Sequence, residues 1–310
     1  MAATDLIDRY RRFLKRRNCA VNTVKNYMNV LHHFNNWLQI SVEEVTKKET
    51  DAYMDHLLRS RKKPKTINCH LSCIHGFYEY LIKEERMPLI NPVRGKYKLR
   101  VPQPLPKHLR DEQVVTLFSK INNARDRAMF MLMLRCGLRV EEVAHLTTDA
   151  IESNRRQLYI FNGKGSKDRV VYLSEDARAA LEEYMQKRKW SKQKRVFLVQ
   201  KGPLTGTPLS VRGIQKRIEQ YAKKADISVS CHYLRHTMAT QLLNADADLV
   251  TIQDLLGHSK ITTTQCYCRV SNLKVQRDYY NAMKVVLQRT QPIRENVFEL
   301  EKGIMDSTTN

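Results

Sequence analysis

Two short segments in the last third of the chain carry side chains suited to phosphate-ester chemistry. In the first, His232-Tyr-Leu-Arg235, an imidazole and a guanidinium are three residues apart, so on a helix both project from one face. The second segment begins at His258, and Tyr267 follows nine residues later. Guanidinium groups bind phosphate oxygens bidentately, imidazoles transfer protons, and a phenol can attack phosphorus. The two segments therefore predict a site for phosphate-ester transfer.

Other residues could supply the positive charge that such a site needs. A phenol has an ordinary pKa of about 10, so Tyr267 would attack poorly unless nearby cations favour phenolate or neutralise the phosphate. Arg139 and Arg235 could do this, and preorganised charge of this kind is usually the largest catalytic contribution. Glu142 lies three residues after Arg139 and therefore on the same face of a helix. Lys164 is of the right type to protonate a leaving oxygen.

Helices are expected to place most of these residues. The spacing of apolar residues predicts helices over 111–118 and 124–135, the second of them buried. A further helix over 248–256 would end at Gly257, because glycine readily adopts the backbone conformation that closes a helix. This arrangement would leave His258 at an exposed helix end.

A β-hairpin is expected to place the candidate lysine. Residues 157–161 and 169–173 are rich in β-branched and aromatic residues, as strands are. Residues 162–168 between them are turn-forming, so Lys164 would lie at the tip of the hairpin. Lys167 lies on the same loop and is a candidate for DNA contact.

The spacing of apolar residues in the first 98 positions predicts a small all-helical domain, because these residues recur at intervals of three and four. Thr46-Lys-Lys-Glu49 has the pattern of a capping box that opens one of its helices. The domain is strongly basic, and its cations could follow a phosphate backbone, although a solvated, solubilising face is the alternative for any single residue. The DNA-binding candidates are Arg12, Lys15, Arg16, Arg61, Lys62, Lys63 and Lys65.

The composition favours a polyanionic partner and the length favours two domains. The 310 residues include 54 lysines and arginines against 32 aspartates and glutamates, which gives a net charge of +22. Residues 99–106 are basic and rich in proline, so they should be an extended linker between a domain of residues 1–98 and one of residues 107–272. Residues 273–310 form a tail with two apolar helical stripes, which need a surface to cover them.

The sequence lacks the patterns of a membrane protein, a disulfide-rich protein or a metalloprotein. The chain has no run of about 18 apolar residues and no secretory pattern, so we expect a soluble cytoplasmic protein with no membrane partner. The odd count of seven cysteines favours reduced thiols. Cys69, His70, Cys73 and His75 could be imagined as zinc ligands, but they lie on an apolar helical pattern without a second paired cluster. We therefore expect no metal.

The order and spacing of the motifs resemble those of the tyrosine recombinases, the phage integrase family. The motifs in this chain are Gly137-Leu-Arg139-Val-Glu-Glu142, Gly163-Lys164-Gly165, His232-Tyr-Leu-Arg235-His236, Leu256-Gly257-His258-Ser259 and Tyr267. The resemblance covers residues 107 to about 270, and the helical domain resembles the family's core-binding domain. It implies a fold that is mainly α with a small antiparallel β-sheet: an all-helical, SAM-like N-terminal domain and a mixed α+β catalytic domain.

The resemblance implies roles for the charged residues. Arg139 and Arg235 are similar to the arginines that bind the scissile phosphate, and Lys164 to the lysine that protonates the 5′ leaving group. Glu142 is similar to the acidic residue that supports the site, and it would orient Arg139 without transferring a proton.

Roles for the remaining site residues also follow from the resemblance. His232 is similar to the proton-handling histidine, His258 to a hydrogen-bond donor to phosphate, and Tyr267 to the nucleophile. We expect His236 to be a packing or supporting residue.

The reaction implied by the resemblance cleaves one DNA strand to a 3′-phosphotyrosine and a free 5′-hydroxyl, and a 5′-hydroxyl of the partner duplex then attacks the ester. Because the ester conserves the bond energy, neither ATP nor a metal cofactor is needed. The implied partners are double-stranded DNA with short inverted-repeat sites and three further copies of the chain, which make a tetramer around a Holliday junction. The protein would work at the bacterial nucleoid, and its tail would dock either on a neighbouring protomer or on its own domain.

Two other functions use the same fold and remain alternatives. A type IB topoisomerase also forms a phosphotyrosine but only reseals the original strand, and a DNA-binding factor could keep the fold without catalysis. Helical stripes begin at Leu6, which leaves no room for a preceding arm-site domain and favours a simple recombinase. Resolution of dimers or cointegrates and integration or excision of a mobile element are both compatible with the sequence.

Overall fold

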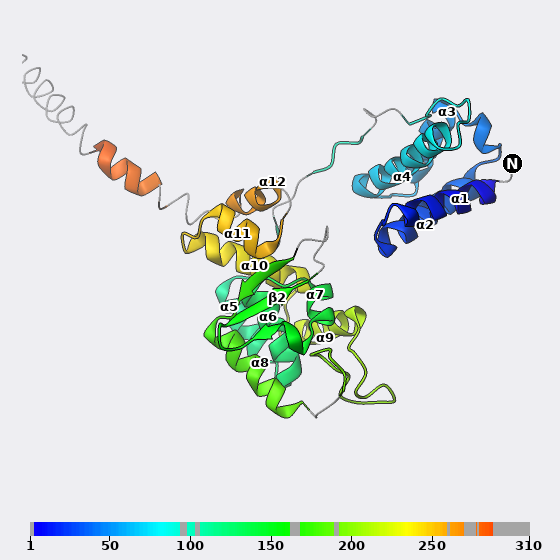
Figure 1. Cartoon of the computed structure of the whole chain (residues 1–310). Coiled ribbons are helices and arrows are strands. Elements are labelled where there is room, and N and C mark those ends of the chain that lie inside the picture. Colours follow the sequence, from blue (N-terminus) through cyan, green and yellow to red (C-terminus); the bar gives the residue numbers. More distant parts are fainter. Residues whose placement is uncertain are drawn as a thin grey trace, which may run out of the picture. The chain divides into compact units, whose positions relative to one another are not determined.

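The computed structural model divides the chain into two compact units, residues 1–103 and 104–310. The division falls inside the proline-rich segment. Figure 1 shows helices in the first unit and helices with one small antiparallel sheet in the second. The expected fold class is thereby confirmed. The structure describes residues 3–93, 98–102, 106–161, 168–188, 192–258, 261–269, 277 and 279–287.

Amphipathic helices form the described part of the N-terminal unit. They are α1 (Ala3–Arg16), α2 (Val21–Trp37), the 3-10 turn η1 (Val42–Glu44), α3 (Lys47–Arg59) and α4 (Pro64–Lys83). The expected capping box opens α3, since the backbone N–H of Thr46 donates to the Glu49 carboxylate at 2.8 Å and the Thr46 hydroxyl accepts from the backbone of Lys48. The fully buried Tyr53 ties three helices together, because its hydroxyl lies 2.7 Å from Nδ1 of His33 and 2.9 Å from Nδ1 of His70.

The basic residues of this unit lie at its surface. They occupy the end of α1 and the turn that leads into α4, where water or a phosphate backbone can reach them. The exposed candidates are Arg12, Lys15, Arg16, Arg61, Lys62, Lys63 and Lys65.

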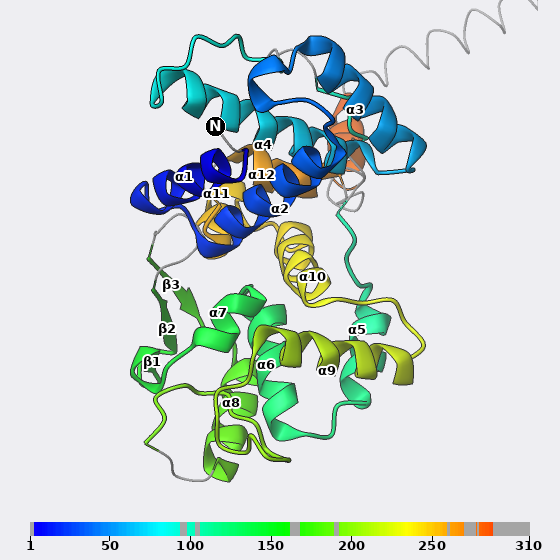
Figure 2. The same cartoon turned by 90° about the vertical axis from the view of Figure 1, so that its right-hand side faces the viewer.

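The second unit is built around one buried helix. Its helices are α5 (Asp111–Ser119), α6 (Ala124–Arg135), α7 (Val140–His145), η2 (Thr148–Ala150), α8 (Glu175–Lys187), α9 (Val211–Lys224), α10 (Cys231–Asn244), α11 (Leu249–Leu256), α12 (Ile261–Thr264) and η3 (Gln265–Arg269). As expected, the run from 128 to 134 on α6 is buried, and α6 packs against α8 and α10 (Figure 2).

Gly137 lets three segments meet directly after α6. Its φ of +65° lies in the left-handed region that favours glycine. A Cβ at this position would lie 3.0 Å from Leu256 and 3.1 Å from the sulfur of Met238. The loop that leads to Arg139 therefore packs closely on α10 and α11.

The sheet contains the expected hairpin. Strands β2 (Gln157–Ile160) and β3 (Arg169–Tyr172) are antiparallel, with Leu158 opposite Val171, and β1 (Ile151–Glu152), which the sequence did not predict, pairs with β2. The hairpin tip with Lys164 and Lys167 lies outside the described residues. In the part of the chain that the structure describes, no helix is long and apolar enough to cross a lipid bilayer.

A buried charge cluster joins α6 to α9. The fully buried Asp126 accepts hydrogen bonds from Arg125 at 2.7 and 2.9 Å, from Arg217 at 2.6 Å and from the Tyr221 hydroxyl at 3.1 Å. Arg125 also donates to the carbonyl of Leu198 at 2.9 Å. One carboxylate thus fixes two helices and a loop that are distant in sequence.

Replacing Asp126 is expected to destabilise this unit. Asp126→Ala would leave Arg125 buried without its counter-charge, so the free energy of unfolding should fall by about 3–5 kcal/mol, measured by urea unfolding of the full chain. Asp149→Ala is the matched control, because the ion pair of Asp149 with Lys194 is exposed and should contribute less than about 1 kcal/mol. Equal losses in the two variants would contradict the assigned role of Asp126.

Candidate active site

Arg139 and Glu142 form the first part of the site. Arg139 is the N-cap of α7, and its backbone N–H donates to Oε2 of Glu142 at 2.7 Å. Its Nη1 donates to Oε1 of the same carboxylate at 2.9 Å. These two hydrogen bonds hold the Arg139 side chain beside the helix start, as the three-residue spacing predicted.

Arg235 is the most deeply buried cation of the site. It lies on α10 at 4% exposure, and its guanidinium donates to the carbonyls of Gly137 and Leu256. Burial, followed by the charge of Arg139, lowers the pKa of Arg235 to about 9. A nearby anion would therefore relieve an unfavourable concentration of positive charge.

The end of α11 accepts hydrogen bonds from three arginines. Gly257 closes the helix at φ +59°, as predicted. The carbonyl of Leu255 accepts from Nε of Arg169 at 2.9 Å, that of Leu256 from Arg235, and that of Gly257 from Nη2 of Arg139 at 3.3 Å. The last carbonyls of a helix lack partners within the helix and carry partial negative charge, so cations suit this position.

Arg169 is a site residue that the sequence analysis missed. Its Nη1 and Nη2 donate to the two oxygens of Glu142, both at 2.8 Å, so that Glu142 bridges Arg139 and Arg169. A Cβ at Gly257 would meet the Arg169 side chain at 3.0 Å. The available signal was a lone arginine that begins a strand after the lysine loop, and only the fold shows that this strand lies against α11.

Glu142 is ionised by its partners despite its burial. Burial alone would raise its pKa, but the hydrogen bonds and charge of Arg169, together with the backbone and charge of Arg139, lower the pKa to about 2. The side chain is only 8% exposed, so solvent screens these interactions little. Glu142 supplies the negative charge that lets the arginines lie close together.

His258 lies beside the arginines and not at an exposed helix end, so that expectation was wrong. It is half-buried, and its Nδ1 lies 2.9 Å from the Thr264 hydroxyl. Burial, then the charges of Arg235 and Arg139, lower the pKa of His258 to about 4. The exposed-end expectation failed because the chain folds back after Gly257, and α12 covers the imidazole on one side.

Tyr267 is buried in the same region. It lies in η3 at 1% exposure, and burial, then the neighbouring Cys266, raise its pKa to about 12 against the opposing charges of Arg235 and Arg139. Its hydroxyl lies 2.7 Å from Nδ1 of His236. His236, which was expected to be a packing or supporting residue, contacts the hydroxyl of the candidate nucleophile directly.

The structure brings together most of the side chains that the sequence singled out. Arg139, Arg235, His258 and Tyr267 act on one another electrostatically, and Glu142 joins them through the arginines. The His232 ring lies edge-on to the His236 ring with centroids 5.6 Å apart. Lys164 and Lys167 are outside the described residues, so their placement relative to this group stays a prediction.

The residues considered as zinc ligands have separate partners. His70 contacts the Tyr53 hydroxyl, Nδ1 of His75 lies 2.8 Å from the carbonyl of Val93, and Cys69 accepts from Asn26 at 3.3 Å. Within the described ranges, no group of three or more His, Cys, Asp or Glu residues could hold a metal ion.

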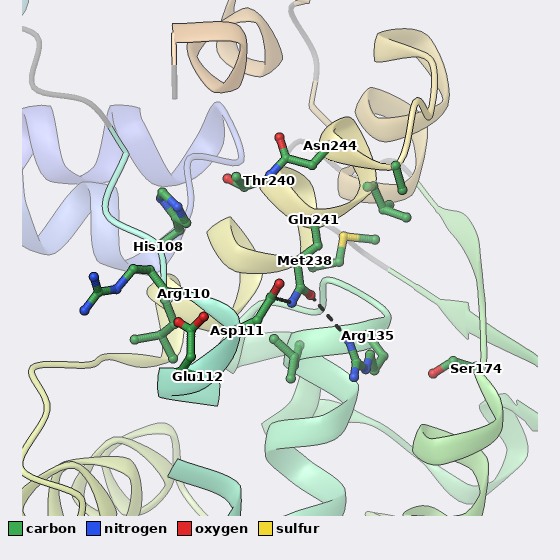
Figure 3. Close-up of a pocket in the computed structure, with 14 residues that line it drawn as sticks. His108, Arg110, Asp111, Glu112, Arg135, Ser174, Met238, Thr240, Gln241 and Asn244 are labelled. Atoms are coloured by element: carbon green, nitrogen blue, oxygen red, sulfur yellow. Dashed lines mark hydrogen bonds between the residues drawn. The ribbon is translucent and has the colours of Figure 1, made fainter. Parts of the chain in front are cut away.

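A cavity of about 730 Å³ lies elsewhere on α10 (Figure 3). Its α10 residues Gln241 and Asn244 lie about two turns beyond Arg235 towards the end of the helix. Gln241 crosses it, donating to Asp111 at 2.7 Å and accepting from Arg135 at 3.3 Å. Of the described residues around this cavity, none belongs to the group of Arg139, Arg169 and Arg235, so the candidate site is that group at the end of α11 and not this hollow.

A helical N-terminal unit and a second unit that gathers arginines around a phenol have the form expected of a DNA strand transferase. Residues 107–274 match the model of the Phage integrase family, and residues 6–86 match the N-terminal SAM-like domain of phage integrases. The chain belongs to the phage integrase family and is a tyrosine recombinase, an enzyme of site-specific recombination.

Relatives and solved structures agree with this assignment. The chain is 35% identical over 273 residues to the tyrosine recombinase XerD of Pseudomonas putida, across 83% of this chain and 89% of the relative. It is 30% identical to the tyrosine recombinase XerC of Staphylococcus haemolyticus, across 86% and 92%. The fold is similar to that of a lambda integrase dimer bound to a COC′ core site, with a TM-score of 0.71 and 18% identity over 85% of this chain and 94% of that one.

The charge network around Glu142 predicts a pH-dependent stability. Its pKa is about 2 in the folded chain against an ordinary 4.5, and because the folded value is the lower one, the carboxylate stabilises the fold above about pH 4.5 and loses this effect as the pH falls towards 2. The difference in unfolding free energy between wild type and Glu142→Gln should shrink by about 2 kcal/mol from about pH 6 to pH 3. Urea unfolding at several pH values measures this difference.

Glu141→Gln is the control for that series, since Glu141 is exposed and next in sequence. If the difference in unfolding free energy between wild type and Glu142→Gln stays constant over the same pH range, the arginines do not stabilise the ionised form of this carboxylate.

Proposed function

We propose that this chain cleaves and rejoins DNA through a covalent bond between Tyr267 and a 3′-phosphate. The observation that carries the proposal is that Arg139 and Arg235 both bind carbonyls at the end of α11. Both charges also act on the Tyr267 hydroxyl, whose pKa they lower. A phosphodiester in contact with both guanidinium groups would have its developing charge neutralised while the phenol attacks.

The arginines are proposed to bind the nonbridging oxygens of the scissile phosphate. A guanidinium has five N–H donors, so the carbonyl bonds of Arg235 orient it and leave capacity for an anion. Glu142 orients Arg139. His258, held by Thr264, donates a further hydrogen bond to phosphate. These roles rest on the geometry around α11 together with the family pattern.

Proton transfer and DNA contact are proposed for residues that the geometry constrains less. His232, on α10, transfers protons during the reaction, and Lys164 protonates the 5′ leaving oxygen. Lys167 and the exposed cations of the N-terminal unit contact the phosphate backbone. The ester conserves the bond energy, so the reaction proceeds without ATP or a metal cofactor.

The assembly is proposed to be a tetramer on two recombination sites. A lambda integrase tetramer bound to a Holliday junction has a TM-score of 0.70 to this chain, over 85% of this chain and 76% of that one. By analogy, four copies of this chain would join two duplexes at short inverted repeats, at the nucleoid in the cytoplasm. The proposed role is resolution of replicon dimers or cointegrates, or movement of a small mobile element. Footprinting of inverted repeats near its own gene would locate the site.

The tail of residues 273–310 is proposed to dock on a neighbouring protomer. Its described part exposes Tyr279, Tyr280 and Leu287, which favours a covering partner.

Deleting residues 290–310 should abolish strand exchange and reduce tetramer formation on DNA, because the link between protomers is lost. Electrophoretic mobility and recombination of a two-site plasmid measure both effects, and binding of the monomer to a single half-site should be unchanged. Unchanged exchange with wild-type tetramers would show that the tail packs on its own domain.

Tyr267→Phe is the direct test of the proposed nucleophile. The variant should bind its site like wild type but form no covalent adduct with a nicked recognition site, because the attacking oxygen is missing. Denaturing electrophoresis of labelled DNA measures the adduct. Tyr172→Phe, at an exposed strand position, is the matched control and should react normally.

The same assay separates the alternative functions. An adduct with Tyr267→Phe would refute the assignment of the nucleophile. An adduct with wild type accompanied by relaxation of plasmids that lack the site would indicate a topoisomerase, and no wild-type adduct would indicate a non-catalytic DNA-binding factor.

A further inference from the structure

His236 holds the hydroxyl of the candidate nucleophile. The residue follows Arg235 on α10, and its Nδ1 lies 2.7 Å from the Tyr267 oxygen, an ordinary hydrogen-bond distance. The His236 and Tyr267 rings have centroids 5.6 Å apart, and the His232 ring stands edge-on to the His236 ring at the same centroid distance. Tyr267 is 1% exposed, so protein atoms surround this contact.

The surroundings of His236 keep its imidazole neutral. Burial, followed by the charges of His232, Arg235 and His108, lowers the pKa of His236 to about 4. His236 and His258 also act on each other, since each protonated imidazole disfavours the other. At neutral pH the ring therefore has one nitrogen without a proton. In the tautomer that carries its proton on Nε2, Nδ1 accepts a hydrogen bond from the phenol, which keeps its own proton.

Tyr267 needs a proton acceptor to react. With a pKa of about 12, about one phenol in 10⁵ is ionised at pH 7, so preformed phenolate is scarce. A positioned base that removes the proton during attack avoids this limit. The base has to lie within hydrogen-bond distance of the oxygen, and His236 does.

We propose that His236 is a catalytic residue, the general base that accepts the phenolic proton of Tyr267 during strand cleavage. The bond between the Tyr267 oxygen and phosphorus forms, the bond between phosphorus and O5′ breaks, and the phenolic proton moves to Nδ1 of His236. O5′ leaves with a proton from Lys164. In strand joining, His236 returns its proton to the departing Tyr267 oxygen. This inference rests on the proposed function. It gives a proton-transfer role to His236, whereas the motif pattern gave such a role to His232 alone among the histidines.

His236→Asn separates proton transfer from positioning. The asparagine side chain can offer an oxygen to the Tyr267 hydroxyl near the place of Nδ1, but it cannot take up a proton. Single-turnover cleavage of a nicked DNA that carries the recombination site should fall about 10²- to 10⁴-fold, the usual contribution of a general base. His145→Asn is the matched control, because His145 is exposed and its Nδ1 faces the carbonyl of Glu141, and it should cleave at the wild-type rate.

Two outcomes of this comparison would overturn the proposal. If His236→Asn cleaves like wild type and only His236→Ala is slow, the histidine positions the phenol without taking its proton. If His236→Ala cleaves faster than wild type, the contact is a restraint that keeps Tyr267 away from DNA.

The pH profile and the reverse reaction give independent readouts. Because the base in cleavage is the acid in joining, His236→Asn should slow both steps by the same factor and leave the equilibrium fraction of covalent complex unchanged. Its cleavage rate should rise with pH by close to tenfold per unit below the phenol pKa, whereas the wild-type rate should level off. A variant that slows cleavage alone, or that follows the wild-type profile, would contradict the role.

Fluorotyrosine in place of Tyr267 provides a further test. It lowers the phenol pKa, so in His236→Asn it should restore cleavage at neutral pH more than it changes wild type. If His236→Asn does not fold, the wild-type chain alone is compared: base-assisted attack should depend weakly on the phenol pKa, and a strong dependence would overturn the proposal.

Tyr267→Phe distinguishes the failure of this inference from the failure of the proposed function. An adduct formed without the Tyr267 hydroxyl would remove both. Loss of the adduct in Tyr267→Phe combined with wild-type cleavage and pH dependence in His236→Asn would remove the role of His236 alone.

Discussion

Three guanidinium groups held by consecutive main-chain carbonyls at the end of α11 are the interaction on which the rest of the site depends. Arg169 comes from β3, Arg235 from α10 and Arg139 from the start of α7, and they meet at Leu255, Leu256 and Gly257. Like charges repel, so this arrangement requires compensation. The dipole of α11 supplies part of it and the Glu142 carboxylate supplies the rest. Strand β3, helix α10 and the start of α7 thus bring the three guanidinium groups together at the end of α11.

The same interaction prepares the site for an anion. The charged form of Arg235 is disfavoured by burial and by Arg139, and it is supported by the charge of Glu142 and by hydrogen bonds that its guanidinium donates to two carbonyls. A phosphate that enters this surface meets donors already oriented, so little reorganisation is needed when charge develops on its oxygens. Burial, and then the positive charge around them, opposes protonation of His236 and His258. The cations thus add to the effect of burial in keeping these imidazoles neutral.

Much of this could be predicted from the sequence because the signals are local. The pairing of Arg139 with Glu142, the glycine end of α11 and the hairpin follow from spacing and residue type over a few positions. Arg169 could not be recognised in this way, because its partners Glu142 and Leu255 lie 27 and 86 positions away. The misplacement of His258 and the unforeseen contact of His236 with Tyr267 have one origin. The position of Tyr267 depends on how the chain folds back after Gly257, and no local pattern specifies that path.

Holding the arginines by main-chain carbonyls has a consequence for evolutionary change. Every amino acid supplies the same carbonyl, so substitutions at 255 and 256 can alter the side chains packed there without removing the acceptors. Gly257 is the exception, since it combines a left-handed backbone with Arg169 at 3.0 Å from a Cβ. The positions of the three arginines therefore depend on the course of the main chain at residues 255–257 and less on the side chains there. Surfaces that read DNA sequence can diverge around it, and lineages with different target sites can retain one reaction centre.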